Sequence, residues 1–221
     1  IENHHCRILI SCVKKIDKDV VEEEPEEKPI DPFAGENMFI DIETKRLVLK
    51  CIDQSDRDFI FEEYQNDFIT KYQYDEEPMT DIKEADDLIE FYNMKEPRNQ
   101  NRWVIIDKNR KIKMGTCGFH LWDKERNEVE IGFELMEKYN GKGYMTEAVE
   151  AIIEFAKIQM KVDIIKALVY VENYKCKRLV ERFGFKKVDK EECIFRGKIY
   201  LHDIYEKNLK VNDSNLTTAS T

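Results

Sequence analysis

The sequence predicts a single domain of the α/β (α+β) class, with a mixed, mostly antiparallel central sheet flanked by about four helices. Two patterns favour it: strand-like alternation interrupted by charged turns, and a strand, glycine turn and long amphipathic helix over residues 127–160. At 221 residues and 42% hydrophobic content, the chain can bury one full core with residues to spare. We expect the domain at 39–209, an appendage at 1–38 and a flexible tail at 210–221.

The appendage contains a linker at residues 22–32, where three prolines and repeated glutamates oppose regular hydrogen bonding. Before it, Cys6–Val13 is apolar enough for a short strand, although so short a run does not distinguish strand from helix. The residues after Leu209 lack an apolar period, which predicts fraying.

The domain opens with a strand at Arg46–Ile52, and Ser55 is then the expected N-cap of a helix beginning at Asp56. A second helix is expected from Ile82 to Met94, because it must end before Pro97.

A hairpin follows, with strands at 102–107 and 113–123 joined by a charged turn, and a third strand at 127–136 pairs with them. Alternation in the third strand places Val129, Ile131, Phe133 and Leu135 on one face. It places Glu128, Glu130, Gly132 and Glu134 on the other face.

A turn at 139–143 leads into the helix 144–160, whose apolar residues recur at helical spacing. A buried strand at 164–171 precedes a helix opened by Asn173 and ended by Gly184 in a left-handed conformation. Two last strands, 186–195 and 199–207, meet at the turn 196–198. Trp103 and Trp122 are expected in the core.

The formal net charge of -10 and the pI of about 5.1 argue against nucleic-acid or anionic-membrane partners and favour a cationic partner.

No window offers the roughly 20 apolar residues that cross a bilayer, and the start lacks the order of charged, apolar and small residues that is typical of a signal peptide. The six cysteines form no CxxC pair, which indicates reduced thiols and a cytoplasmic protein without metal. His4, His5, His120 and His202 receive no role, because none has the spacing of a metal site.

The strand, turn and helix around Gly141 and Gly143 form an expected anion site, because the first N–H groups of a helix are unpaired at its positive end. A plain tight turn is the simpler alternative. The residue spacing fits neither a Walker loop nor a Rossmann fingerprint.

The run Glu130–Ala148 resembles the cofactor motif of the GCN5-related N-acetyltransferase (GNAT) superfamily, and most of all its RimJ/RimL-like ribosomal-protein N-terminal acetyltransferase branch. Asn173–Phe185 resembles the family's second motif, and Thr44–Lys50 the branch's first strand. The likeness covers residues 43–208. It implies a sheet that splays at the cofactor site, acetyl-coenzyme A (acetyl-CoA) as donor, and transfer to a primary amine.

The resemblance also assigns binding residues. Backbone groups near Leu135 and Met136 would stabilise the oxyanion, and Asn173 would contact the pantetheine arm, cap the following helix, or do both. Asn140 stands where the branch usually has Trp. The pyrophosphate would lie on the backbone of the turn and helix start, formed by Lys138, Asn140, Gly141, Lys142, Gly143, Tyr144 and Met145.

Glu130 is the expected general base, because the amine must lose a proton before it attacks the thioester. A solvated glutamate is the alternative reading, and Glu134 is a weaker second candidate that would be solvated or attract a cation. Cys176, at the branch's Ser position, would contact or protonate the leaving sulfur, unless it is an inert buried thiol. Tyr174 and Tyr205 are other candidate acids, since Val180 replaces the Tyr of many relatives.

We therefore expect an N-acetyltransferase that acts by direct attack in a ternary complex, on a peptide N-terminus or a small amine, as a monomer or homodimer. The acidic run Asp75–Glu77 would attract such an acceptor, although Leu201 replaces an Asp of the branch. Two alternatives stay open. One is a non-catalytic acyl-CoA binding module, and the other is an interaction protein acting through residues 1–32.

Overall fold

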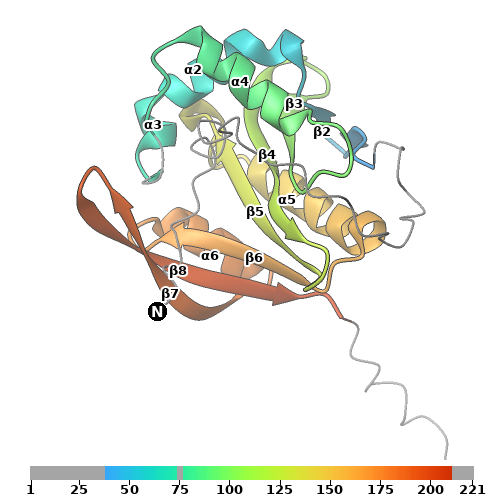
Figure 1. Ribbon diagram of the computed structural model, residues 1–221. Helices are drawn as coiled ribbons and strands as arrows, with labels where there is room; N and C mark the ends of the chain where they lie inside the picture. The colour runs from blue at the N-terminus through green and yellow to red at the C-terminus, as the bar shows by residue number, and fades with distance from the viewer. Residues whose placement is uncertain (1–37, 74–76, 211–221) are drawn as a thin grey trace, which may run out of the picture.

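The computed structural model describes residues 38–73 and 77–210, and Figure 1 colours them along the chain. The expected strand at Cys6–Val13, the linker at 22–32, His4, His5, most of the acidic run at 75–77 and the tail after residue 210 lie outside the described residues.

One eight-stranded sheet forms the centre of the domain, in the order β1-β2-β3-β4-β5-β6-β8-β7. Only β5 and β6 pair in parallel, and every other neighbouring pair is antiparallel, which confirms the expected mixed sheet. The expected strands lie within one residue of those observed, while β1 was not predicted. The strands are β1 Ile42–Glu43, β2 Leu47–Cys51, β3 Asn101–Asp107, β4 Lys113–Asp123, β5 Glu128–Leu135, β6 Ile164–Tyr170, β7 Lys186–Phe195 and β8 Lys198–Asn208.

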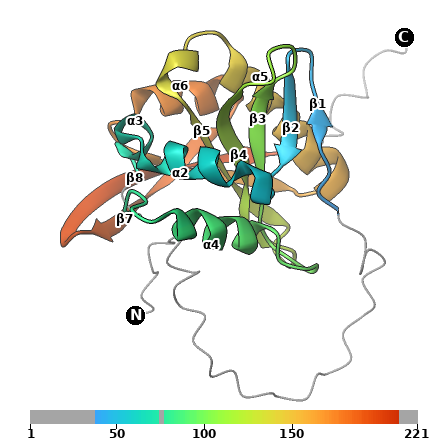
Figure 2. The ribbon, with the colours of Figure 1, turned by 90° about the horizontal axis from the view of Figure 1, so that it is seen from above.

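Helices cover both faces of the sheet. Figure 2 shows α2 and α4 along one face and α5 across the other. The short α3 was not predicted. The α-helices are α2 Arg57–Gln65, α3 Asp67–Thr70, α4 Ile82–Tyr92, α5 Tyr144–Phe155 and α6 Tyr174–Arg182, and the short turns are η1 Gln54–Asp56, η2 Glu137–Tyr139 and the π-helical η3 Ala156–Met160.

The core divides at the sheet because successive strand residues point to opposite faces. On β3, Trp103 and Ile105 pack into the larger cluster, which includes α5, whereas Val104 packs with α2 and α4. Trp103 is fully buried and Trp122 nearly so, as predicted.

The expected N-cap at Ser55 is wrong. The chain first forms the 3₁₀ turn η1, and Asp53 caps it by accepting a hydrogen bond from the Ser55 N–H at 2.8 Å. Asp56 returns the contact by accepting from the Asp53 N–H at 2.9 Å. Asp53 lies one residue before the turn, so its carboxylate can reach the unpaired backbone N–H groups at the start of the turn. Ser55 lies inside the turn and cannot cap it.

The strands β5 and β6 separate soon after they meet. They pair at Glu128–Glu130 and Ile164–Lys166, and the remaining lengths of both strands line a cleft. This divergence confirms the expected splay of the sheet and places the ends of β5 and β6 beside the starts of α5 and α6.

Candidate active site

A cleft of about 1320 Å³ occupies the gap between the diverging strands. Its walls come from β5, β6 and the first turns of α5 and α6, with α3 and β8 at one end. The predicted site residues that line it are Glu130, Leu135, Asn140, Gly141, Gly143, Tyr144, Met145, Asn173 and Cys176. The sequence motif and this cleft thus coincide.

The start of α5 carries no side-chain cap. Gly143 occupies the N-cap position with φ 77°, and Gly141 has φ 74°. Both angles lie in the left-handed region, which costs a residue with a Cβ strain that glycine avoids. The first N–H groups of α5 therefore remain available at the positive end of a twelve-residue helix, as an anion site requires.

The turn before α5 is anchored through Glu147 to the short segment that joins β1 and β2. Its carboxylate accepts from Thr44 Oγ1 at 2.6 Å, from the Arg46 N–H at 2.7 Å and from Arg46 Nε at 2.6 Å. Burial works to raise the pKa of Glu147, but these bonds outweigh it and hold the pKa below its ordinary value. Arg46 Nη1 also donates to the Lys142 carbonyl at 2.9 Å, so the segment just before β2 holds the turn in place.

Three predicted cofactor residues lie outside the lining of the cleft. Lys142 Nζ turns back to donate to the Lys138 carbonyl at 2.8 Å, and both ammonium groups lie over the Tyr139 ring. The Met136 N–H donates to the Met114 carbonyl at 2.9 Å, so the ladder with β4 already uses this expected oxyanion donor. Because N–H groups alternate along a strand, that of Leu135 points away from β4, toward the cleft.

Glu130 lies opposite His120 across β4 and β5, and the His120 Nε2 is 2.8 Å from Glu130 Oε1. Cross-strand partners share a face, which explains the contact. Both side chains line the cleft and both are largely buried. Sequence analysis assigned His120 no role, because the spacing of the histidines indicated no metal site and only the register of the folded sheet places His120 opposite Glu130.

A second histidine of the cleft lies on β8. The His202 ring centroid is 5.6 Å from that of Tyr170, and burial lowers the pKa of the His202 imidazole. Sequence analysis assigned His202 no role either. β8 is far from β5 and β6 along the chain, and only the strand order of the sheet brings it beside the cleft.

The expectation that Glu134 is solvated or attracts a cation is wrong. Glu134 forms an ion pair with the fully buried Arg102 and accepts from Thr116 Oγ1 at 3.2 Å. Thr116 Oγ1 also lies 3.0 Å from Glu63 Oε2, and burial raises the pKa of Glu63 to about 7, although Arg102 opposes the rise. A buried guanidinium needs a counterion, and Glu134 supplies it.

Asn173 caps α6, since its Oδ1 accepts from the Cys176 N–H at 3.2 Å. This contact confirms the capping half of the prediction. Burial raises the pKa of the Cys176 thiol to about 12. Of the other candidate acids, Tyr174 borders the cleft but is 64% exposed, whereas Tyr205 donates to Glu181 at 3.0 Å and does not line the cleft.

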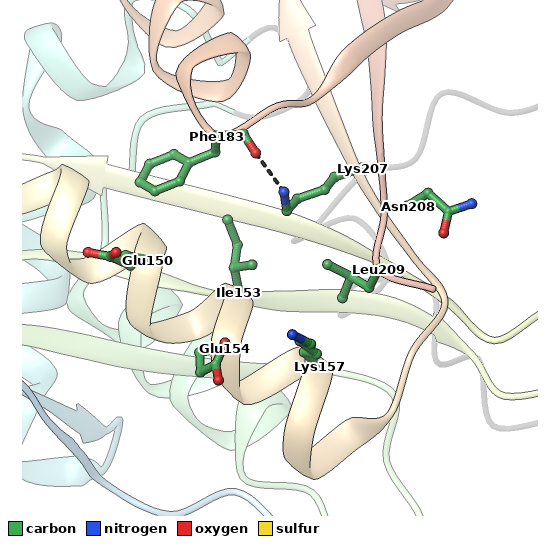
Figure 3. Close-up of a pocket in the computed structure, with 8 residues that line it drawn as sticks. All are labelled: Glu150, Ile153, Glu154, Lys157, Phe183, Lys207, Asn208 and Leu209. Atoms are coloured by element: carbon green, nitrogen blue, oxygen red, sulfur yellow. Dashed lines mark hydrogen bonds between the residues drawn. The ribbon is translucent and has the colours of Figure 1, made fainter. Parts of the chain in front are cut away.

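A smaller hollow of about 410 Å³ lies between α5, the end of α6 and β8 (Figure 3). Lys207 Nζ crosses it to donate to the Phe183 carbonyl at 2.7 Å, which satisfies a backbone group at the end of α6. No predicted site residue borders this hollow.

Within residues 38–73 and 77–210, no group of three or more His, Cys, Asp or Glu side chains is arranged to hold a metal ion. The helices in the same part of the chain are all too short or too polar to cross a membrane.

Comparisons with known proteins agree with this geometry. Residues 46–186 match the family model described as an acetyltransferase (GNAT) domain. The chain is 32% identical over 163 residues to the N-acetyltransferase p20 of Bacillus licheniformis, covering 73% of this chain and 91% of p20. It is 30% identical over 164 residues to the N-acetyltransferase YoaA of Bacillus subtilis, covering 74% and 90%.

The fold also matches a crystal structure of spermidine N-acetyltransferase from Vibrio cholerae in complex with CoA and spermine. The TM-score is 0.67 at 21% identity, over 75% of this chain and 97% of that one. The family match covers the turn before α5, the lining of the cleft apart from Cys193 and His202, and strands β2 to β6. The chain is therefore an acyltransferase and belongs to the GNAT family of acetyltransferases.

Proposed function

We propose that this enzyme transfers the acetyl group of acetyl-CoA to a primary amine by direct attack within a ternary complex. One observation carries the proposal: a single cleft has the uncapped start of α5 at one end and the Glu130 carboxylate, held by His120, in its wall. The first feature suits a pyrophosphate and the second suits proton removal.

The donor would lie along the splayed strands. Backbone N–H groups from Gly141 to Met145 would hold the pyrophosphate, whereas the Asn140 N–H already donates to the Glu137 carbonyl at 3.0 Å. The anchored position of the turn reduces the ordering that binding requires. Lys138 and Lys142 would add long-range attraction rather than direct contact, since both side chains are directed to the Tyr139 ring. Asn173 caps α6 with its side-chain oxygen, which leaves its amide nitrogen for the pantetheine arm.

The chemical step would begin with proton transfer from the ammonium group of the acceptor to Glu130. The amine nitrogen then forms a bond with the acetyl carbon, the carbonyl oxygen becomes negative, and the Leu135 N–H stabilises it. Collapse of this intermediate breaks the C–S bond and releases the thiolate of CoA, and the product nitrogen gives its second proton to water. His120 would hold the Glu130 carboxylate in place throughout.

Cys176 would donate a hydrogen bond to the leaving sulfur rather than transfer its proton. With a thiol pKa of about 12, full transfer to a CoA thiolate, whose pKa is about 8 to 9, is uphill. The thiolate can leave without a protein acid and take its proton from water.

The acceptor would be a peptide N-terminus, as the RimJ/RimL-like motifs suggest, or a small amine. The Vibrio cholerae structure contains spermine, and the net charge of -10 favours a cationic acceptor here as well. We propose a cytoplasmic enzyme that works as a monomer or homodimer, which light scattering would test.

The test is thiol release from acetyl-CoA, measured with peptides, polyamines and other primary amines, alongside calorimetry with CoA. We expect CoA binding and release with at least one amine class. Binding of CoA with no release across the panel would instead identify an acyl-CoA binding module. Absence of CoA binding would refute both readings.

A further inference from the structure

His202 and Glu130 line the same cleft from strands that are not neighbours in the sheet. Glu130 lies opposite Lys166 of β6, and His202 lies opposite Tyr170 of the same strand. An even number of residues separates Lys166 from Tyr170, so both belong to one face of β6. His202 therefore faces the same side of the sheet as Glu130. The match to the family model ends at residue 186 and does not include His202.

The hydrogen bond of His202 identifies the ring nitrogen that carries its proton. Nδ1 lies 3.3 Å from the Tyr200 carbonyl oxygen, and a carbonyl oxygen can only accept. Nδ1 is therefore the donor, and in the neutral ring Nε2 holds the lone pair. Among the residues that the structure describes, Nε2 has no hydrogen-bond partner, and it is accessible to solvent. His202 thus presents a basic nitrogen to the cleft.

The other histidine of the cleft is arranged differently. His120 Nε2 faces the Glu130 carboxylate and carries the proton of that contact. The lone pair of the neutral ring is then on His120 Nδ1, which is buried and has no partner within the described part of the chain. A base must present its lone pair to the group that loses the proton. His202 meets this requirement, whereas His120 holds the carboxylate.

The surroundings of His202 keep its ring neutral but suit a proton transfer to it. Burial lowers the pKa of the imidazole below its ordinary value of 6.5, while the bond to Tyr200 and the charges of Glu130 and Asp203 oppose that shift. The ring is therefore mostly neutral at pH 7. The charge of Asp203 stabilises the imidazolium that forms when the ring accepts a proton.

Acetyl transfer to an ammonium group releases two protons of different acidity. The first comes from the free acceptor, whose alkylammonium group has a pKa of about 10. The second leaves after the C–N bond has formed. The nitrogen is then bonded to a carbon that carries oxygen and sulfur, which draw electron density from it and make it more acidic. A neutral imidazole is a weak base, and it suits this second, more acidic proton.

We propose that His202 Nε2 is a second catalytic base, which takes the proton from the nitrogen of the tetrahedral intermediate directly or through one water molecule. The inference rests on the proposed function. Glu130 accepts the first proton, and the nitrogen bonds to the acetyl carbon. His202 accepts the second proton while the C–S bond breaks and its electron pair leaves on the thiolate. The imidazolium then passes this proton to water, which restores the neutral ring.

Two substitutions separate proton transfer from structural support. His202→Asn keeps an N–H near the position of Nδ1 for the Tyr200 carbonyl, and His202→Gln puts an amide near the position of Nε2. Neither amide accepts a proton at neutral pH. We expect each substitution to lower kcat at least tenfold, with CoA affinity and thermal unfolding unchanged. Cys193→Ala is the control, because Cys193 lines the same end of the cleft and should leave kcat within threefold of the parent. Parent-like activity of His202→Asn or His202→Gln would overturn the proposal.

The pH dependence of kcat gives a readout that a structural role would not change. In the parent, both Glu130 and His202 must be unprotonated before the reaction. At the acidic end log kcat should therefore fall with a slope of about two. In His202→Asn water takes the second proton, and the slope should be about one. The same slope in both proteins would contradict the role of His202 as a base.

NMR of the parent protein with CoA, labelled with ¹⁵N in its histidines, gives a readout independent of turnover. The His202 signals are assigned by their absence from His202→Gln. The expected ring is neutral at pH 7, with the proton on Nδ1 and none on Nε2. A proton on Nε2 at this pH would overturn the proposal even in an active enzyme. Failure of the proposed function would appear separately, as no thiol release with any amine.

Discussion

His120 and Glu130 face each other across β4 and β5, with the imidazole Nε2 2.8 Å from the carboxylate Oε1. The contact fixes the carboxylate in the wall of the cleft, in a position to take a proton from a bound amine. The contact therefore joins Glu130, which sequence analysis identified as the candidate base, to His120, to which it assigned no role.

Glu130→Gln should lower kcat about 100-fold to 1,000-fold, because the amide cannot accept the proton of the acceptor. CoA affinity should stay unchanged, since the residue lies away from the start of α5. The measurement is the pH dependence of kcat and kcat/KM. Glu128→Gln is the matched control, because Glu128 lies on the same strand but pairs with Lys166 at 2.8 Å and does not line the cleft. Unchanged turnover of Glu130→Gln at every pH would remove Glu130 as the base.

His120→Leu should lower kcat about 3-fold to 30-fold, a smaller loss than at Glu130, because the carboxylate remains but loses its hydrogen-bond donor. The acidic limb of the pH–rate profile should move to higher pH, since the carboxylate then holds its proton more tightly. A purely structural role would lower activity without moving that limb.

Gly141→Ala should raise the Kd of CoA at least tenfold, because alanine opposes φ 74° and shifts the amides that bind the pyrophosphate. Gly197→Ala is the matched control: its φ is 69°, and as at Gly141 no atom lies within 4 Å of the added Cβ. Both substitutions should cost about 1 kcal/mol of folding free energy by urea unfolding. Equal CoA affinities of the two variants would show that the turn does not bind the cofactor.

Cys176→Ala should lower kcat less than threefold at saturating substrates, because the pKa of this thiol, about 12, makes it a poor proton donor to CoA. The intact thiol should also react slowly with iodoacetamide at pH 7, since little thiolate is present. A hundredfold loss of kcat in Cys176→Ala that Cys176→Ser does not restore would instead indicate that Cys176 is the acid.

Glu63 should make the protein less stable as the pH rises. Burial raises its pKa in the folded state to about 7, above the ordinary value of 4.5, so the native state holds the proton more tightly than the unfolded chain. Stability should therefore fall between pH 4.5 and about pH 7, by about 3 kcal/mol in total. Urea unfolding should show a flatter profile in Glu63→Gln, which keeps an acceptor for Thr116. Parallel profiles for the two proteins would contradict the assignment.

Most of the fold could be predicted from the sequence because its signals are local. The alternation of β5 and the helical spacing of α5 are visible within a few residues, and so is the glycine turn between them. The start of the first helix was misplaced because Asp53, Ser55 and Asp56 all suit a cap. Only the reciprocal bonds of the folded turn distinguish among them.

The polar side of the cleft could not be predicted in the same way. Arg102 lies directly before the apolar run Trp103–Ile106, and its counterion comes from β5 after the chain has turned twice. The Met136 N–H was expected to bind an oxyanion, yet the register of β4 and β5 pairs it with Met114. Sequence spacing indicates which residues share a strand face, but not which residue of the next strand lies opposite.

The early separation of β5 from β6 has a further consequence for the protein without its cofactor. The two halves of the sheet are joined at Glu128–Glu130 and Ile164–Lys166, and beyond these positions alternate amides face the cleft. We expect those amides to exchange hydrogen with deuterated solvent quickly in the unliganded protein and slowly once CoA spans the gap. Binding of CoA would then reduce local opening where β5 and β6 diverge, and it would protect these segments from proteases.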